Sequence, residues 1–408
     1  MPTSKRMTSV ATAATAIIFG SVTAVLMHTQ IRTSQLSGVR GVETNPIVGA
    51  NVGDDGQSAA LSDEERLTLR LDWTDLPPMS EMAKRIHHSQ TSVDVRLYKK
   101  HVHFEAGLGS NLHTWAQSLC HAVENDLTLL TRGPWKWMDG KSCPAVDKGV
   151  TDGSGNPMRC YFGAHVDGGT GVSSSPQGEE IAFASESVPA SETMSCPSIQ
   201  GVGEGMYSVG EWMEAATEFL FQSLDPAVIS EAERQVRAVF PQGLPHPDDL
   251  VTVNVRWGDK GSEMPLQPIW AYMRAVRDLV RTRPKERAHF PVHVYLATED
   301  PEALKRFMEA AGRENPPWRV HSSGPLQDRK DNNMWTFASG RRGLESMAAL
   351  LISMEANRYV LTTGSNWSRL INELRNGVVN PRCNNCTEMV DLYYGESPKM
   401  QPDGTVVW

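Results

Sequence analysis

The sequence has none of the usual signs of a nucleic-acid-binding or zinc-binding protein. It contains 39 Lys and Arg against 48 Asp and Glu, a net charge of -9, and its basic residues form no tract. A chain with this balance has no general attraction for nucleic acid, so any anion site must be local. Its one Cys-x-x-Cys pair lacks the second pair that a four-thiolate zinc site needs. We therefore expect no nucleic-acid partner and no four-thiolate zinc site.

The length and the cysteine content indicate how many domains the chain can form and in which compartment it folds. The 408 residues are enough for two domains with their own cores, and six cysteines fit an oxidising compartment. Cys383-Asn-Asn-Cys386 could be half of a zinc site, a redox pair or a local disulfide, and we favour the disulfide. Two glycosylation sequons begin at Asn366 and Asn385. We expect the second on a surface loop and the first unused, because it lies in a proposed ligand loop.

An uncharged stretch, Thr8 to Met27, follows Lys5 and Arg6 near the start of the chain. About 20 apolar or small residues are enough to span a bilayer as a helix. We favour a signal anchor with a short cytoplasmic tail. Basic residues lie on both sides of the stretch, so the positive-inside rule gives only slight support to a lumenal catalytic part. The alternatives are a signal peptide cleaved after Val22-Thr-Ala24, and a transit peptide or disordered tail.

Strand-like and helix-like patterns alternate through the body of the chain. Extended character at Val93–Phe104 is followed by a glycine loop, a helix to about Glu124 and a short strand at Leu127–Thr131. After Pro245 the alternation is regular, with strands expected at 250–256, 292–297 and 359–362 and helices at 268–283, from 301, at 343–357 and after 365. This order predicts an α/β fold with parallel sheets and right-handed crossovers.

The most informative stretch runs from Val251 to Glu263. Its valines have the two-residue period of a strand, and four charged residues then follow within eight positions: Arg256, Asp259, Lys260 and Glu263. Open α/β sheets build ligand sites at the carboxyl ends of their strands. The planar fork of an arginine suits a phosphate. We therefore predict a site for an anionic, nucleotide-like donor here, while Asp259 is equally compatible with a structural ion pair to Lys260.

Three other segments are weaker candidates. Gly107-Leu-Gly109-Ser-Asn111-Leu-His113 permits close approach to a ligand but lacks the third glycine of a dinucleotide fingerprint, and a core or capping role fits His113 as well. Ser365 and Asn366 open a helix whose amides favour an anion, although an ordinary N-cap explains them too. Glu299 and Asp300 follow a strand, where carboxylates bind ribose or base edges or simply favour a helix start.

Taken together, these segments resemble the α1,6-fucosyltransferase family and, more distantly, other GDP-fucose-dependent transferases. The family's His-Val-Arg-Arg-x-Asp-Lys and Pro-Ile-x-x-Tyr-Met segments are similar to 254–260 and 268–273. Its Val-Tyr-Leu-Ala-Thr-Asp-Asp-Pro is similar to 294–301, its Ser-Ser-Gln-x-x-Arg to 364–369, and its Gly-x-Gly-x-Gln-Leu-His to 107–113. The resemblance covers about residues 100 to 376, with gaps.

The resemblance implies a GT-B-like fold of two facing Rossmann-like domains, GDP-fucose as the donor, inversion at the fucose carbon, and no metal or other cofactor. By position, Arg256 would contact the β-phosphate, and Lys260 and Glu263 would be the relay and the base. The donor site would further include Gly107, Gly109, Asn111, His113, Asp259, Tyr272, Glu299, Asp300, Ser365 and Asn366.

The chain departs from the family pattern at several of these positions. Trp257 replaces the second arginine, Asn254 replaces the histidine, and an aspartate expected near Ala349 is absent. Two alternatives to fucosyl transfer therefore stay open. One is a catalytically inactive protein of the same fold that binds a nucleotide sugar or glycan. The other is a transferase that uses another nucleotide sugar.

The overall prediction is an inverting glycosyltransferase that moves fucose from GDP-fucose to a glycan or glycoprotein hydroxyl. We place it in the Golgi membrane as a single-pass type II protein with a lumenal catalytic part. The expected segments are a cytoplasmic tail and signal anchor (1–33), a stem (34–92), an N-terminal α/β domain with an irregular insertion and helical connector (93–240), a nucleotide-sugar-binding α/β domain (241–380) and a C-terminal tail (381–408).

Overall fold

The structure is a computed structural model that describes residues 68–92, 98–103, 105–138, 155–167, 180–181, 208–257, 265–324, 338–393, 399–400 and 406–407. All of these belong to one compact unit, Ala60–Trp408. The predicted signal anchor and most of the predicted stem lie outside the described residues. Within the described ranges, no helix has the length and apolar character needed to cross a bilayer.

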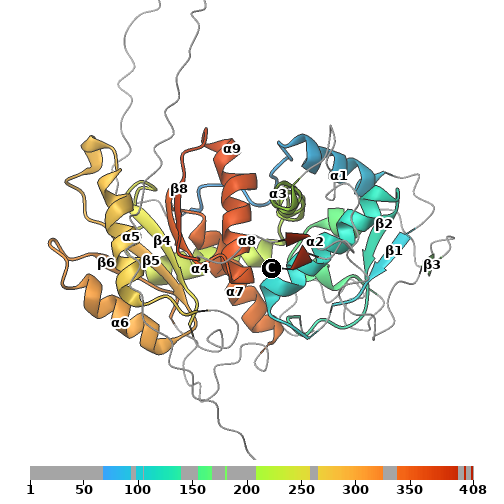
Figure 1. Ribbon diagram of the computed structural model, residues 1–408. Coiled ribbons are helices and arrows are strands. Elements are labelled where there is room, and N and C mark those ends of the chain that lie inside the picture. Colours follow the sequence, from blue (N-terminus) through green and yellow to red (C-terminus); the bar gives the residue numbers. More distant parts are fainter. Residues whose placement is uncertain are drawn as a thin grey trace, which may run out of the picture. The chain divides into compact units, whose positions relative to one another are not determined.

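The larger sheet has five parallel strands. They are β4 (Leu250–Val255), β5 (His293–Thr298), β6 (Arg319–His321), β7 (Arg358–Leu361) and β8 (Glu388–Asp391), in the order β6-β5-β4-β7-β8 (Figure 1). Every residue of the central strand β4 is buried, as expected for a parallel strand covered on both faces. The α/β class with parallel sheets, predicted from the alternating pattern, is confirmed.

Helices cover both faces of this sheet. Val251, Val253 and Val255 pack in one apolar cluster with α5 (Ile269–Arg281) and α6 (Pro301–Ala311). Leu250 and Tyr295 point to the other face and join a larger cluster. That cluster includes α4 (Pro226–Val239), α7 (Gly340–Ser353) and α8 (Asn366–Leu374) (Figure 1). The two-residue period of the strands therefore gives three layers.

A smaller parallel sheet lies in the N-terminal part. Its strands are β1 (Tyr98–His101), β2 (Thr128–Thr131) and β3 (Glu180–Ile181), in the order β2-β1-β3. Helix α2 (Leu108–Glu124) connects β1 to β2, so the predicted strand, glycine loop, helix and strand occur in the predicted order. Helices α2 and α3 (Val209–Leu220) share the larger apolar cluster with α7 and α8.

Two segments predicted to lie outside the body belong to it. The end of the predicted stem forms α1 (Glu81–Thr91), whose Met82, Ala83 and Ile86 are buried in the larger cluster. The predicted C-terminal tail supplies β8, which pairs with β7 at the edge of the sheet. Both elements are short, and their places in the fold depend on partners far away in the sequence.

The chain after α8 closes with a disulfide. A π-helical turn (Arg375–Val379) and α9 (Asn380–Arg382) lead to the Cys383–Cys386 bond, which confirms the favoured interpretation of this pair. Cys120 and Cys160 are also disulfide-bonded. Short strands β9 (Lys399–Met400) and β10 (Val406–Val407) form a separate antiparallel pair.

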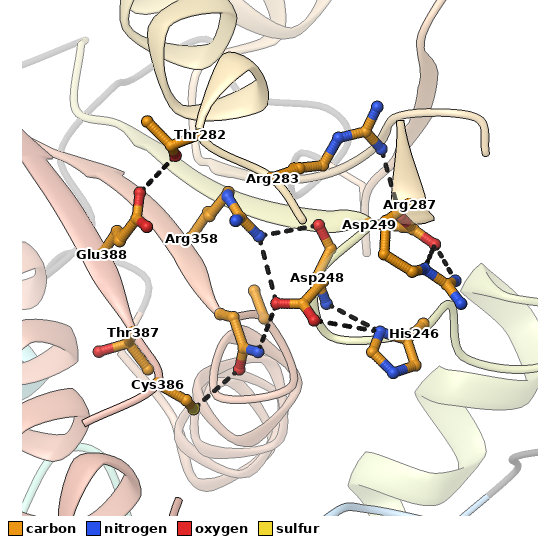
Figure 2. Close-up of polar contacts among 12 residues, drawn as sticks. His246, Asp248, Asp249, Thr282, Arg283, Arg287, Arg358, Cys386, Thr387 and Glu388 are labelled. Carbon is orange, nitrogen blue, oxygen red and sulfur yellow. Dashed lines mark hydrogen bonds and ion pairs between the residues drawn. The ribbon is translucent and has the colours of Figure 1, made fainter. Parts of the chain in front are cut away.

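A buried ionic network fixes the amino edge of the larger sheet (Figure 2). Asp249, just before β4, accepts hydrogen bonds from Arg283 at 3.2 Å and from Arg287 Nε at 3.1 Å. The side chains of Asp249 and Arg283 are each only 5% exposed, and burial lowers the pKa of Arg283. Arg358, at the start of β7, donates to the backbone oxygen of Asp248. This network lies at the opposite edge of the sheet from the strand ends discussed below.

We predict that Asp249→Asn lowers the free energy of unfolding by about 3 kcal/mol or more, because it leaves two arginines near the sheet without their carboxylate. Denaturant titration of both proteins measures the change. Asp278→Asn is the matched control, since its ion pair with Arg281 is exposed and contributes less than about 1 kcal/mol. Equal effects of the two substitutions would contradict a structural role for Asp249.

Candidate functional site

A cleft of about 750 Å³ lies at the carboxyl edge of the larger sheet. The ends of β4 and β5, the turn after β6 and the start of α8 line it, together with parts of α4 and α7 and the glycine loop before α2. Among the predicted site residues, it brings together Gly107, Gly109, Arg256, Glu299, Ser365 and Asn366. This is the edge at which open α/β sheets hold their ligands.

Arg256 is placed in the cleft by the pairing of β4 with β5. Val255 is aligned with Thr298, so the next residues, Arg256 and Glu299, emerge side by side. Their side chains form an ion pair at 3.2 Å, with that of Arg256 13% exposed and that of Glu299 37% exposed. Arg256 also donates to the Trp257 carbonyl at 3.1 Å. The guanidinium is therefore oriented within the cleft wall and not free in bulk solvent.

Tyr272 supports Arg256 from beneath. It is fully buried on α5, and its hydroxyl lies 2.8 Å from that of Thr362, which follows β7. The same hydroxyl is hydrogen-bonded to the backbone of Arg256. Burial raises the pKa of Tyr272 to about 12, although both hydrogen bonds oppose the change. Tyr272 does not line the cleft; it joins the ends of β4 and β7 below it.

Two helix N-termini without side-chain caps open at the cleft. Neither Gly107 before α2 nor Ser365 before α8 supplies a side-chain hydrogen bond to the first turn. The N-cap residues of α1, α3, α4, α6 and α7 all do. Ser365 is the N-cap residue of α8, but its side chain makes no hydrogen bond to the first turn. First-turn amides without caps, together with the helix dipole, favour a bound anion.

Gly109 allows these two N-termini to lie side by side. A Cβ at this position would lie 3.1 Å from the carbonyl carbon of Asn366 and 3.2 Å from Trp367 N. The amide nitrogen of Asn366 donates to Ser110 Oγ at 2.6 Å. That nitrogen is the one a glycan would occupy, so its hydrogen bond agrees with the expectation that the Asn366 sequon is unused. Helices α2 and α8, which follow strands of different sheets, therefore meet in one wall of the cleft.

The other predicted site residues lie elsewhere or are not described. Asp300 caps α6, accepting from Ala303 N at 2.8 Å, and is not among the cleft residues. Asn111 holds the glycine loop by donating to the carbonyls of Ala106 and Gly107 at 3.2 Å each. His113 is buried between α2 and α8. Asp259, Lys260 and Glu263 lie outside the described residues, and their roles stay predictions.

Several cleft residues were missed by the sequence analysis. Arg234 on α4 pairs with Glu231 at 2.6 Å, and Arg342 on α7 pairs with Glu345 at 3.0 Å. Such pairs, three residues apart on a helix, are typical of ordinary exposed helix faces, so no local signal marks them. Ser323, after β6, lies 2.8 Å from the buried hydroxyl of Tyr295. Its position in the cleft follows only from the pairing of β5 with β6.

The structure shows where two residues that depart from the family pattern lie, Trp257 and Ala349. Trp257 donates its indole N–H to the Gln267 carbonyl at 2.8 Å and packs against the α5–α6 side of the sheet. It does not line the cleft. Ala349 does line the cleft, and Glu345 lines it one helical turn earlier on α7. The described residues contain no group of three or more His, Cys, Asp or Glu that could hold a metal ion.

No family model and no curated protein matches the chain. Similar chains occur among solved structures. One is a mutant of Arabidopsis thaliana FUT1 in complex with GDP, which is 11% identical, with a TM-score of 0.42 over 81% of this chain and 78% of that chain. A similarity this weak shows nothing about what the present chain binds. Any function proposed for the chain therefore depends on the residues that line the cleft.

Proposed function

We propose that the chain is an inverting glycosyltransferase that transfers fucose from GDP-fucose to a hydroxyl of a glycan or glycoprotein. The observation that carries the proposal is one cleft in which Arg256 and the uncapped N-termini of α2 and α8 all present hydrogen-bond donors. This set of donors suits a diphosphate. A volume of about 750 Å³ lies in the usual range for a site that encloses a small organic ligand.

The donor end of the reaction needs stabilisation of the leaving group. As the glycosidic bond breaks, negative charge grows on the departing diphosphate, and fixed donors aimed at it lower the barrier. Arg256 is fixed by Glu299 and by the Tyr272 hydroxyl beneath its backbone. The helix amides are fixed by the backbone itself. Neither set of donors has to reorganise as the charge develops.

The acceptor end needs a base. Glu263 follows Arg256 by seven positions in the sequence, and in this proposal its carboxylate takes the proton from the acceptor hydroxyl. Lys260 keeps that carboxylate ionised. The acceptor oxygen attacks the sugar carbon from the side opposite the diphosphate, so the configuration at that carbon inverts. No metal or further cofactor takes part, and the acceptor is met in the Golgi lumen if Thr8–Met27 is a membrane anchor.

Polar groups near the turn after β6 suit the nucleoside. Ser322, Ser323 and Gly324 line the cleft there, and Glu345 lines it from α7. Hydroxyls can bond a ribose, and a carboxylate can accept from the N–H groups of a base edge. The family pattern has an aspartate near position 349, where this chain has Ala349. On α7, Glu345 is therefore the described acidic residue that could bind the base.

A nucleotide-sugar-binding protein without turnover is the second candidate. The observation that favours it is the position of Trp257, which replaces a charged residue of the resembled family and packs outside the cleft. The diphosphate site therefore has one side-chain cation fewer than the family pattern. Binding does not require that charge if the helix amides suffice, whereas turnover needs stabilisation that grows in the transition state.

We predict that Arg256→Ala lowers fucosyl transfer by about 10²- to 10³-fold, the loss typical of removing one donor that stabilises a developing negative charge. Release of GDP from GDP-fucose, measured over a panel of glycan acceptors, gives the rate. Arg281→Ala is the control, since Arg281 is exposed on α5 and should not alter the rate. An Arg256→Ala protein with near-full turnover would remove this residue from the mechanism.

Glu263→Gln separates the two candidate functions. In a transferase it should abolish turnover and leave the affinity for GDP within about twofold, because the base acts on the acceptor and not on the diphosphate. Calorimetry with GDP and the GDP-release assay together measure both properties. If the wild-type protein binds GDP-fucose but releases no GDP with any acceptor, the binding protein is the better description.

Competition among nucleotides tests the donor. GDP should displace labelled GDP-fucose at least tenfold better than UDP or CDP if the cleft distinguishes the base, since an unpaired buried polar group costs about 1–3 kcal/mol. Equal displacement by all three would show that only the diphosphate is recognised. Stronger displacement by UDP or CDP would reassign the nucleotide sugar.

A further inference from the structure

A chain of hydrogen bonds links the two helix N-termini of the cleft to a buried carboxylate. His113 Nδ1 lies 2.9 Å from Asn366 Oδ1, and His113 Nε2 lies 3.0 Å from Glu373 Oε2. The side chains of His113 and Glu373 are only 4% and 8% exposed. Asn366 in turn donates to Ser110. Both Ser110 and Asn366 line the cleft, whereas His113 and Glu373 lie behind it.

The orientation of Asn366 is determined by its other partners. Its amide nitrogen donates to Ser110 Oγ, and its Oδ1 accepts from the guanidinium of Arg369. Burial lowers the pKa of Arg369 to about 10, so this group is still a cation at neutral pH. A flipped amide would put an NH₂ group against that cation. The atom that faces His113 Nδ1 is therefore an oxygen, which accepts.

The other side of the imidazole ring also faces an acceptor. Glu373 Oε2 accepts from Thr217 Oγ1 at 3.1 Å as well as contacting His113 Nε2. Each ring nitrogen of His113 thus lies within hydrogen-bond distance of an oxygen, Asn366 Oδ1 on one side and Glu373 Oε2 on the other. One rigid ring therefore connects Glu373 to the first residue of α8.

We propose that His113, hydrogen-bonded between Glu373 and Asn366, is a positioning residue for the diphosphate end of the cleft. It acts through Asn366, the first residue of α8, which it fixes relative to Ser110 of α2. This inference rests on the proposed function, because it assumes that the paired helix N-termini bind a diphosphate.

The test compares His113→Gln with the wild-type protein for GDP, inorganic pyrophosphate and guanosine. The flexible amide of glutamine cannot contact Glu373 and Asn366 from opposite sides as a rigid ring does. Affinity for GDP and for pyrophosphate should fall about tenfold or more, the usual effect of losing a hydrogen bond that involves a charge. Affinity for guanosine should change by less than about twofold, because guanosine has no phosphate.

His165→Gln is the matched control. His165 is also buried, and it is hydrogen-bonded to the Leu220 carbonyl at 3.1 Å. It does not line the cleft. Its substitution reports the general cost of losing a buried histidine and should leave GDP affinity unchanged. If His113→Gln does not fold, Glu373→Gln provides the second variant, since it keeps the shape but removes the carboxylate that opposes the ring, and the same selective loss is expected.

Nitrogen NMR of histidine-labelled protein gives a second readout, with the His113 signals assigned by their loss in His113→Gln or, if that variant does not fold, by their shift in Glu373→Gln. Both ring nitrogens of His113 should be hydrogen-bonded. A ring with a hydrogen bond at only one nitrogen would overturn the inferred link between Glu373 and Asn366. Equal losses for GDP and guanosine, or unchanged GDP affinity, would overturn the positioning role alone. A wild-type protein that binds neither GDP nor pyrophosphate would overturn the proposed function and this inference with it.

Discussion

The cleft depends on the close approach of the first turns of α2 and α8. These helices belong to different sheets, since α2 connects β1 to β2 and α8 follows β7. Their contact is tight at Gly109, because a Cβ there would lie 3.1 Å from the backbone of Asn366. A replacement at Gly109 would thus require the first turn of α8 to shift slightly even though it adds no charge. The missing side-chain cap lowers the stability of α8 by about 1 kcal/mol, and that of α2 by less, since its N-cap residue is Gly107. The large apolar cluster shared by α2, α3, α7 and α8 offsets that loss.

The sequence predicts the three inner strands of the larger sheet well because its information there is local, whereas the two edge strands, β6 and β8, were not predicted. β4 was expected over 250–256 and is observed over Leu250–Val255, and β5 and β7 lie within about a residue of their predicted bounds. Alternating β-branched residues between turn signals are sufficient for such strands. The positions of Arg256 and Glu299 in the cleft then need only one further fact, the parallel register of β4 and β5.

The rest depends on contacts between residues far apart in the sequence. Asp300 fits a ligand site and a helix cap equally well by its position, and the structure places its carboxylate on Ala303 N. His113 was assigned to the donor site by its place in a motif, but its partners, Asn366 and Glu373, belong to a helix of the other sheet. The strand β8 is too short for its pattern to distinguish it from a tail. None of these outcomes could be derived from a window of neighbouring residues.

The replacement of a charged residue by Trp257 indicates how the anion site is organised. With Trp257 packed outside the cleft, the donors at this end of the cleft are Arg256 and the backbone amides at the starts of α2 and α8. Arg256 is the described side-chain cation at the sheet edge, and it is paired with Glu299. If the proposed function holds, a diphosphate that bonds Arg256 has to compete with that carboxylate. Glu299 is 37% exposed, so it could turn towards water when the anion binds and return when the anion leaves. In that case the ion pair would keep Arg256 oriented while the cleft is empty, and the backbone amides of the two helices would define where the phosphates lie.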